Sequence, residues 1–366
     1  MSVSSADGSA TVGSAGSTNE GQPAQSVTTV LGEIDATDLG RTNYHEHLFQ
    51  VTPLLPDDEL DDEDASGQEA AMLRRSGFEA MIDATPTALG RDPEALARIS
   101  RRADLHVVAT TGAHREAHYG DGHWLTRLSE DQLADLFVAD LEVGVPRRDA
   151  SEADMERHAN RARTDGGLNI RAGLLKAGIG YWGWTGFERR VLAAVAAAHA
   201  RTRAPVMVHL EHGSATFELL ELLRTDGVPP DAVLLAHVDR NPDPGLHGEL
   251  AASGAYLGYD GFARTRDWPD SVLIDCFVRA AELGATERLL LGGDVARRSR
   301  YVAYGGRPGL AYLGTRVIPR LERSGHHDLV QAALVANPAR YLSRRSRRTP
   351  SRTLSQPAPN PTQGKP

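Results

Sequence analysis

The chain has 366 residues, of which 40% are hydrophobic, and a formal net charge of −9. It can bury a sizeable core, and its acidic balance argues against a general nucleic-acid binder, since those proteins are usually basic. The single cysteine, Cys276, cannot form an internal disulfide. We find neither a secretory signal nor an apolar stretch of membrane-spanning length. We therefore expect a cytoplasmic protein without membrane contact.

Low-complexity segments flank the predicted folded unit. Residues 1–27 are rich in Ser, Gly, Ala and Thr, and residues 344–366 are equally poor in apolar residues but basic. Such compositions predict disordered tails. We therefore expect one catalytic domain between residues 28 and 343.

Short apolar segments alternate with helical patterns across this domain. Segments between them, such as residues 186–202, have apolar residues at helical spacing. The alternation predicts a parallel sheet covered by helices on both faces, and eight strands favour a closed (β/α)8 TIM barrel. A doubly wound open sheet is the alternative, but no Gly-rich phosphate-binding sequence follows the first strand. The expected strands are residues 41–49, 78–85, 105–112, 170–178, 204–211, 232–239, 255–261 and 288–296.

Five of the predicted strands end in polar side chains. In a (β/α)8 barrel the carboxyl ends of the strands meet at the face that carries the chemistry. Burying any one of these groups without a partner costs several kcal/mol, and grouping them around cations removes that cost. The residues are His45, His47, Lys176, His209, His237 and Asp294.

Lys176 is the exception in this set, because an ammonium group is repelled by divalent cations. Burial can deprotonate a lysine, and a neutral amine can take up carbon dioxide to become a carbamate. The two oxygens of a carbamate can bridge two metals. The alternative is an ion pair between Lys176 and Asp294 or Glu211.

Six segments resemble the phosphotriesterase family of the amidohydrolase superfamily, in order, from about residue 28 to about residue 343. They are "YHEHLF", "GLLKAGIG", "VMVHLEHG", "LLAHVDRNPD", "LLLGGDVA" and "NPARYL". The resemblance implies a metal-dependent hydrolase on a (β/α)8 barrel, with two divalent cations, commonly zinc, bridged by a hydroxide and by N6-carboxylysine. Manganese, cobalt and iron are alternatives. Barrels of this family often pair, so a homodimer is also implied.

The resemblance also implies a role for each ligand. The more buried metal would be bound by His45, His47 and Asp294, and the more exposed one by His209 and His237. Lys176 would bridge both metals as N6-carboxylysine. Asp294 would orient the hydroxide, accept its proton and pass it to the leaving group.

Two arginine-rich stretches, residues 259–270 and 292–306, bear on the substrate. They resemble the family branch that acts on phosphorylated furanose lactones, in which a basic residue and an Arg-x-x-Tyr pair hold the phosphate. The resemblance implies substrate contacts from Arg264 or Arg266, and from Arg298 and Tyr301. The alternative is a solvated or salt-bridged loop surface.

The favoured function is thus a binuclear metal-dependent hydrolase whose substrate is a small anionic ester or lactone. A phosphorylated sugar lactone is the expected substrate. A phosphotriesterase acting on neutral organophosphate esters is the second candidate. A non-catalytic barrel that binds a metal or a metabolite is the third. A serine hydrolase is disfavoured, because we find no Gly-x-Ser-x-Gly motif.

Three further features lie near the predicted strand ends. Tyr44, Trp182 and Trp184 either line the pocket or pack within loops. His114 and His118 are interpreted as loop residues that bind no metal. The acidic segment, residues 56–69, is interpreted as a solvated excursion after the first strand.

Overall fold

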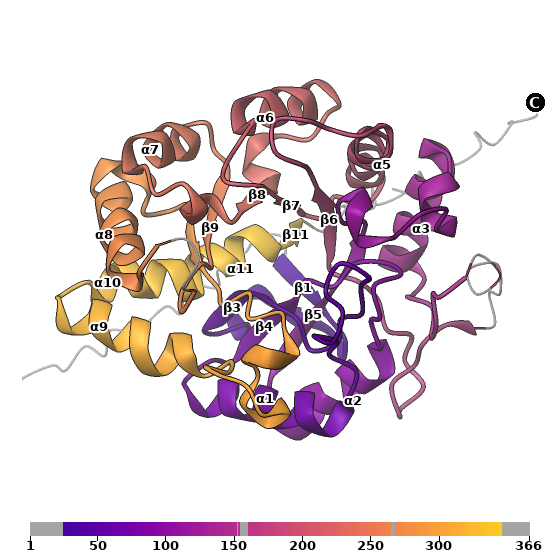
Figure 1. Ribbon diagram of the computed structural model, residues 1–366, viewed down its shortest axis with the longest axis horizontal. Coiled ribbons are helices and arrows are strands. Elements are labelled where there is room, and N and C mark those ends of the chain that lie inside the picture. Colours follow the sequence, from indigo (N-terminus) through magenta and orange to yellow (C-terminus); the bar gives the residue numbers. More distant parts are fainter. Residues whose placement is uncertain (1–24, 152, 154–159, 265–267, 346–366) are drawn as a thin grey trace, which may run out of the picture.

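Eight parallel strands stand at the centre of the molecule, and helices surround them (Figure 1). The computed structural model describes residues 25–151, 153, 160–264 and 268–345. This arrangement confirms the predicted (β/α)8 barrel. The barrel strands are β3 (Thr42–Glu46), β4 (Ala80–Asp83), β5 (His106–Gly112), β6 (Leu174–Gly178), β7 (Val206–His209), β8 (Val233–Ala236), β9 (Tyr256–Tyr259) and β10 (Leu289–Leu291).

Each strand pairs in parallel with the next one along the chain, from β3 to β10. The ring is closed between the last strand and the first, where the amides of Gly293 and Asp294 donate hydrogen bonds to the carbonyl of His45 at 3.2 and 2.9 Å. This closure places Asp294, which follows β10, beside the histidines that end β3.

Helices follow the strands and cover the outside of the barrel (Figure 1). Their starts match local sequence signals. The helix α5 begins with a capping box of Thr185 and Glu188, and α2 begins with Asp92 as its cap followed by Pro93. The helices are α1 (Glu63–Arg75), α2 (Pro93–Ala103), α3 (Glu130–Glu142), α5 (Gly186–Thr202), α6 (Thr216–Thr225), α7 (Pro244–Ala252), α8 (Asp270–Ala280), α9 (Ile318–Arg323), α10 (His327–Gln331) and α11 (Asn337–Leu342).

The barrel interior explains why the polar residues stand where they do. Alternate residues of a strand face the interior. In β6, Leu174 belongs to a buried apolar cluster with residues of other strands, and Lys176 comes two residues later. In β7, Met207 belongs to the same cluster and His209 comes two residues later. The apolar part of the interior thus ends where the polar side chains begin.

A small antiparallel sheet joins the two ends of the described chain. Its order is β11 (Arg344–Arg345), β1 (Gln25–Thr29), β2 (Gly32–Asp35). These strands reach slightly beyond the predicted bounds of the domain. Most of both predicted tails, residues 1–24 and 346–366, lies outside the described residues.

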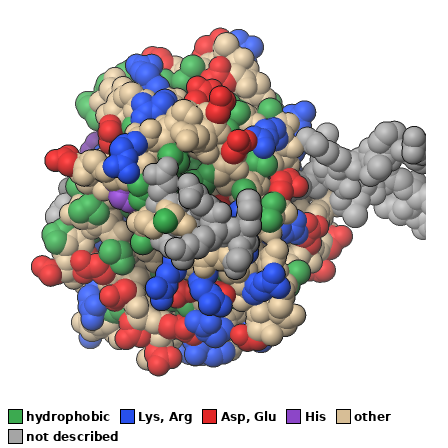
Figure 2. All heavy atoms as spheres, turned by 90° about the vertical axis from the view of Figure 1, so that its right-hand side faces the viewer, with side chains coloured by type: hydrophobic (Ala, Val, Ile, Leu, Met, Phe, Trp, Pro, Cys, Tyr) green, Lys and Arg blue, Asp and Glu red, His purple; other side chains and the backbone are tan. Residues whose placement is uncertain are grey.

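Acidic and basic side chains are interspersed over the face shown in Figure 2. Among the described helices, none combines the length and the apolar character that crossing a membrane requires.

Candidate active site

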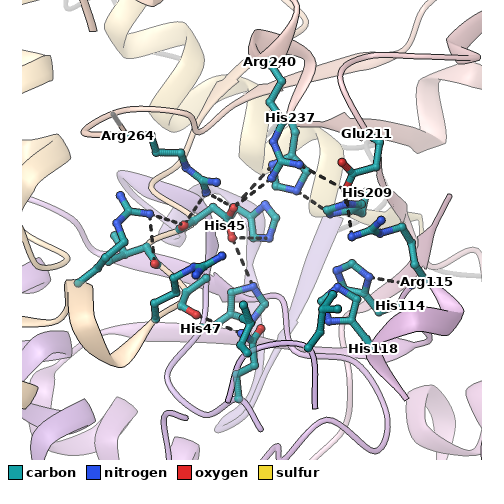
Figure 3. A pocket seen from close by; sticks show the side chains of 18 of the residues that line it. His45, His47, His114, Arg115, His118, His209, Glu211, His237, Arg240 and Arg264 are labelled. Atoms are coloured by element: carbon teal, nitrogen blue, oxygen red, sulfur yellow. Dashed lines mark hydrogen bonds and ion pairs between the residues drawn. The ribbon is translucent and has the colours of Figure 1, made fainter. Parts of the chain in front are cut away.

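A cavity of about 660 Å³ lies at the carboxyl ends of the barrel strands. Figure 3 shows the imidazoles of His45, His47, His209 and His237 grouped around its centre. All six side chains predicted as metal ligands line this cavity, although they come from five different strand ends: His45, His47, Lys176, His209, His237 and Asp294.

The first group of candidate ligands consists of His45, His47 and Asp294. The Nε2 atoms of both histidines lie 3.6 Å from Asp294 Oδ1. Ligand atoms at zinc distances in a tetrahedral site are roughly 3.3 Å apart, so these three atoms have the spacing of metal ligands. The buried Nε2 of His45 also finds no hydrogen-bond partner among the described residues, as expected of a nitrogen that binds a cation. This group therefore fits a metal.

The second group consists of His209 and His237. The Nδ1 atom of His209 and the Nε2 atom of His237 face each other at 2.8 Å. The opposite nitrogens contact carboxylates, with His209 Nε2 at 2.8 Å from Glu211 and His237 Nδ1 at 2.7 Å from Asp260. Carboxylates behind metal-binding histidines fix the ring orientation and the tautomer. Burial lowers the pKa of His237 to about 3, so its imidazole is neutral, as a ligand must be.

Lys176 is 1% exposed, and its Nζ donates a hydrogen bond to the Ala84 carbonyl at 2.8 Å. Burial lowers its pKa to about 8, although Asp294 and Asp83 oppose the shift. Within the described residues, Lys176 forms no ion pair with Asp294 or Glu211 at 4.0 Å or less. Burial thus increases the neutral fraction of this amine, and the neutral amine is the form that carbamate formation requires.

The sequence analysis missed Asp260, which follows β9 and is fully buried. One carboxylate oxygen faces His237 Nδ1, and the other faces His45 Nδ1 at 3.0 Å and accepts the Tyr44 hydroxyl. A side chain at Gly258 would collide with that hydroxyl. Burial opposes ionisation, but His237 and His45 hold the pKa of Asp260 well below its usual range. One carboxylate thus orients a histidine from each ligand group.

Arginines gather at the mouth of the same cavity. Arg264 donates to the carboxylate of Asp294 and to its carbonyl. Burial opposes ionisation of Asp294, but Arg264 and His45 hold the pKa of that carboxyl well below its usual range. Arg297, Arg300 and Arg307 also line the cavity, so basic side chains gather on this side of it.

Two other predicted substrate residues, Arg298 and Tyr301, do not line this cavity. The Arg298 guanidinium stacks over the Tyr304 ring at 5.1 Å and lies 3.7 Å from Asp61, and this side chain does not line the cavity. Tyr301 is fully buried, and its hydroxyl donates to the carbonyl of His47. Arg266 lies outside the described residues. A substrate contact from any of these three residues stays a prediction.

The model of the phosphotriesterase family matches residues 25–151 and 160–342. The chain belongs to the phosphotriesterase family. It is 30% identical to a phosphotriesterase homology protein of Mycobacterium tuberculosis, over 86% of this chain and 97% of that protein. It is 27% identical to a phospho-furanose lactonase of Mycoplasmopsis agalactiae, over 87% of this chain and 91% of that protein.

A solved structure supports the same assignment. The crystal structure of a lactonase from Listeria monocytogenes superimposes with a TM-score of 0.76 at 28% identity, covering 87% of this chain and 98% of that chain. This member of the phosphotriesterase family is therefore a hydrolase that acts on ester or lactone bonds, and its histidine and aspartate groups could hold a metal.

In this phosphotriesterase-family barrel, the acidic segment is a solvated excursion only in part: Asp57, Asp61, Asp62 and Asp64 are exposed, but other carboxylates of the segment bind the backbone of a distant loop. The carbonyl of Asp58 accepts the amide of Arg298 at 3.2 Å, and its carboxylate accepts the amide of Ser299 at 2.9 Å. Its second carboxylate oxygen lies 3.5 Å from the Arg297 guanidinium. The acidic segment therefore holds the backbone that carries the cavity arginines.

Glu69, at the far end of the acidic segment, extends this contact. It is fully buried, and its two oxygens accept the amides of Ala303 at 2.7 Å and Leu310 at 2.9 Å. We call residues 297–307 the arginine loop. Its conformation is set by carboxylates more than 200 positions earlier in the chain.

His114 and His118 come close to the second ligand group. Both line the cavity, and the His114 ring lies 4.4 Å from the His209 ring. The Nδ1 of His114 accepts the amide of Arg115 at 2.7 Å, as expected for a loop. Among the described side chains, those spaced for a metal are His45, His47 and Asp294 in one group and His45, His237 and Asp260 in another, so neither His114 nor His118 nor His209 belongs to them.

Proposed function

We propose that this protein opens a lactone that carries an anionic group, with the aid of two divalent cations. The observation that carries the proposal is that Arg264 and the arginine loop contribute to the same cavity as the polar strand ends. The planar fork of arginine suits a phosphate dianion, and late loops of (β/α)8 barrels often bind phosphate. A phosphorylated sugar lactone has both the reactive carbonyl and the anion that such a cavity can hold.

The strand-end residues would hold the cations, and zinc is favoured by the imidazole ligands. When bound, the cations supply a hydroxide at neutral pH and polarise a C=O or P=O bond. The grouping would be His45, His47 and Asp294 for one cation, His209 and His237 for the other, and Lys176 as a carboxylated bridge.

The chain's own groups would orient the reaction and move its proton. Asp294 would take the proton of the attacking water and deliver it to the ring oxygen, whose bond to the carbonyl carbon breaks. One water is consumed, and the product is a hydroxy acid. Arg264, which donates to Asp294, would keep that carboxylate ionised and aimed at the reacting atoms.

The relatives support this choice of substrate. The similar protein from Mycoplasmopsis agalactiae is named a phospho-furanose lactonase, and the similar structure from Listeria monocytogenes is a lactonase. A phosphotriesterase acting on neutral esters is the second candidate, because the same strand-end groups could also serve attack at phosphorus. A neutral substrate would leave the cavity arginines without an anionic partner. A non-catalytic barrel would have no use for a buried lysine such as Lys176.

The test is to measure kcat and KM for matched plain and phosphorylated lactones and for an aryl phosphotriester. We expect the phosphorylated lactone to be the best substrate. Arg300→Ala should raise KM for it at least tenfold more than for the plain lactone. Arg224→Ala is the control, because this exposed arginine of α6 pairs with Glu221. The same comparison with Arg298→Ala tests the contact that the family resemblance implies.

Equal effects of Arg300→Ala on both lactones would end the phosphate assignment. Preference for the phosphotriester would favour the second candidate. Bound metal without hydrolysis of any ester would favour the non-catalytic barrel.

A further inference from the structure

A second cavity, of about 880 Å³, lies next to the one that holds the candidate ligands. The two cavities share the lining residues Glu211, His212 and Arg240. Figure 3 shows Glu211 and Arg240 on the side of the site where His209 and His237 lie. The arginine loop contributes to the first cavity and not to the second. A bound molecule can therefore extend from the reactive centre in two directions of different chemistry.

Exposed aromatic side chains line this second cavity. Tyr181 is 64% exposed, Trp182 61% and Phe217 44%. Among the described residues, the aromatic side chains with such exposure are these three and Trp268. Single exposed apolar residues need no explanation, but a group around a cavity marks a binding surface. Flat rings are bound by stacking on such side chains.

The backbone is strained at Trp182 and in the neighbouring loop after β7. Trp182, His212 and Ala215 all have left-handed backbone angles, with φ of 51°, 51° and 55°. Such conformations are costly for residues other than glycine and cluster at functional sites. The amide of Trp182 donates to the Ser214 hydroxyl at 3.3 Å, which ties the loop after β6 to the loop after β7. Trp182 therefore faces solvent because two loops hold it there.

The charges around the second cavity select against an anion. Glu211 and Glu218 both line it, and Arg240 is the arginine on its wall. Arg115 lies 3.0 Å from Glu211, and Arg240 lies 3.6 Å from it, so Glu211 already draws on the neighbouring positive charge. Because the neighbouring arginines are engaged by Glu211 and Glu218 adds a further negative charge, the second cavity offers an anion little attraction, whereas the anionic group of the substrate has the arginine loop on the other side.

We propose that the second cavity binds an uncharged, flat apolar ring carried by the substrate on the side away from the arginine loop. This inference rests on the proposed function, since it concerns the substrate of the same site. The natural substrate would then be larger than a simple sugar lactone. Trp182 and Phe217 would determine specificity by stacking on its ring, and Glu211 would form the wall between the reactive centre and that ring.

The test combines a specificity ratio with a direct binding measurement on the metal-loaded protein. The ratio is kcat/KM for a phenyl-substituted lactone divided by that for the unsubstituted lactone. We expect it to fall by about tenfold or more in Trp182→Ala and in Phe217→Ala, as for loss of a substantial part of an apolar pocket. Val143→Ala is the control, because Val143 is an apolar residue of similar exposure, at 51%, outside both cavities. It should leave the ratio unchanged.

Binding of 2-naphthol, followed by saturation-transfer NMR, separates this inference from the proposed function. We expect the wild-type protein and Val143→Ala to bind it and Trp182→Ala and Phe217→Ala to lose most of that binding. If no lactone is hydrolysed but this binding pattern holds, the proposed function fails and the cavity assignment stands. If the variants bind 2-naphthol like the wild type, or keep the wild-type specificity ratio, the cavity assignment is overturned.

Discussion

Asp260 offers the sharpest test of how the candidate ligands are positioned. Its two oxygens face His237 Nδ1 at 2.7 Å and His45 Nδ1 at 3.0 Å, and both imidazole nitrogens act as donors when the opposite nitrogens bind cations. In Asp260→Asn, one oxygen becomes an NH2 group, so one imidazole N–H must face a donor. Leaving a buried donor unsatisfied costs about 1–3 kcal/mol.

That cost corresponds to a measurable loss of metal. Replacing a carboxylate behind a metal-binding histidine lowers metal affinity by about 10–100-fold, which is about 1.4–2.7 kcal/mol and agrees with the cost of one unsatisfied donor. We expect Asp260→Asn to release metal at a 10–100-fold lower chelator concentration than the wild type. Elemental analysis after dialysis against graded chelator measures this, and turnover should return on addition of excess metal.

A buried carboxylate away from the site provides the control. Asp140 is fully buried and pairs with Arg91 at 2.8 Å, so Asp140→Asn should lower the free energy of unfolding without changing the chelator midpoint. If Asp260→Asn keeps its metal and its turnover at the wild-type chelator midpoint, then Asp260 does not position the histidines. If both variants lose metal equally, the loss reflects stability alone.

Three other predictions follow from single buried groups. Lys176→Met should remove at least one metal and reduce turnover by orders of magnitude, and near-normal metal content and rate would contradict its bridging role. Glu69→Gln turns an acceptor for Ala303 or Leu310 into a donor and should lower the free energy of unfolding by about 1–3 kcal/mol; an unchanged urea midpoint would contradict this. Burial raises the pKa of Cys276 to about 11, so at pH 8 the folded protein should resist iodoacetamide and react only when unfolded. Fast labelling of the folded protein at pH 8 would show that the thiol is accessible.

The barrel and the six candidate ligands could be predicted because they depend on local sequence. Lys176 lies within β6 and His209 ends β7, each two residues after an apolar residue of the barrel interior, and that alternation is visible in the sequence. Asp260 could have been found by the same reasoning, because it directly follows β9. It was overlooked because its role, holding two histidines from other strands, appears only when the strands are brought together.

The arginine loop could not be predicted in the same way. Whether Arg298 or Arg300 reaches the cavity depends on how a short loop turns. A shift of one or two residues along such a loop reverses the direction in which a side chain points. That turn is fixed by Asp58 and Glu69, which are more than 200 positions away. A solvated segment and a segment that holds a distant loop have the same acidic composition, so the sequence alone did not distinguish them.

The pairing between the acidic segment and the arginine loop has a consequence for redesigning the substrate range. Because Asp58 and Glu69 accept hydrogen bonds from the backbone amides of Ser299, Ala303 and Leu310, these contacts do not depend on which side chains the loop carries. Point substitutions within residues 297–307 should therefore keep that path. A loop of different length from a relative should therefore be grafted together with that relative's counterpart of the acidic segment, since hydrogen bonds join the two segments here.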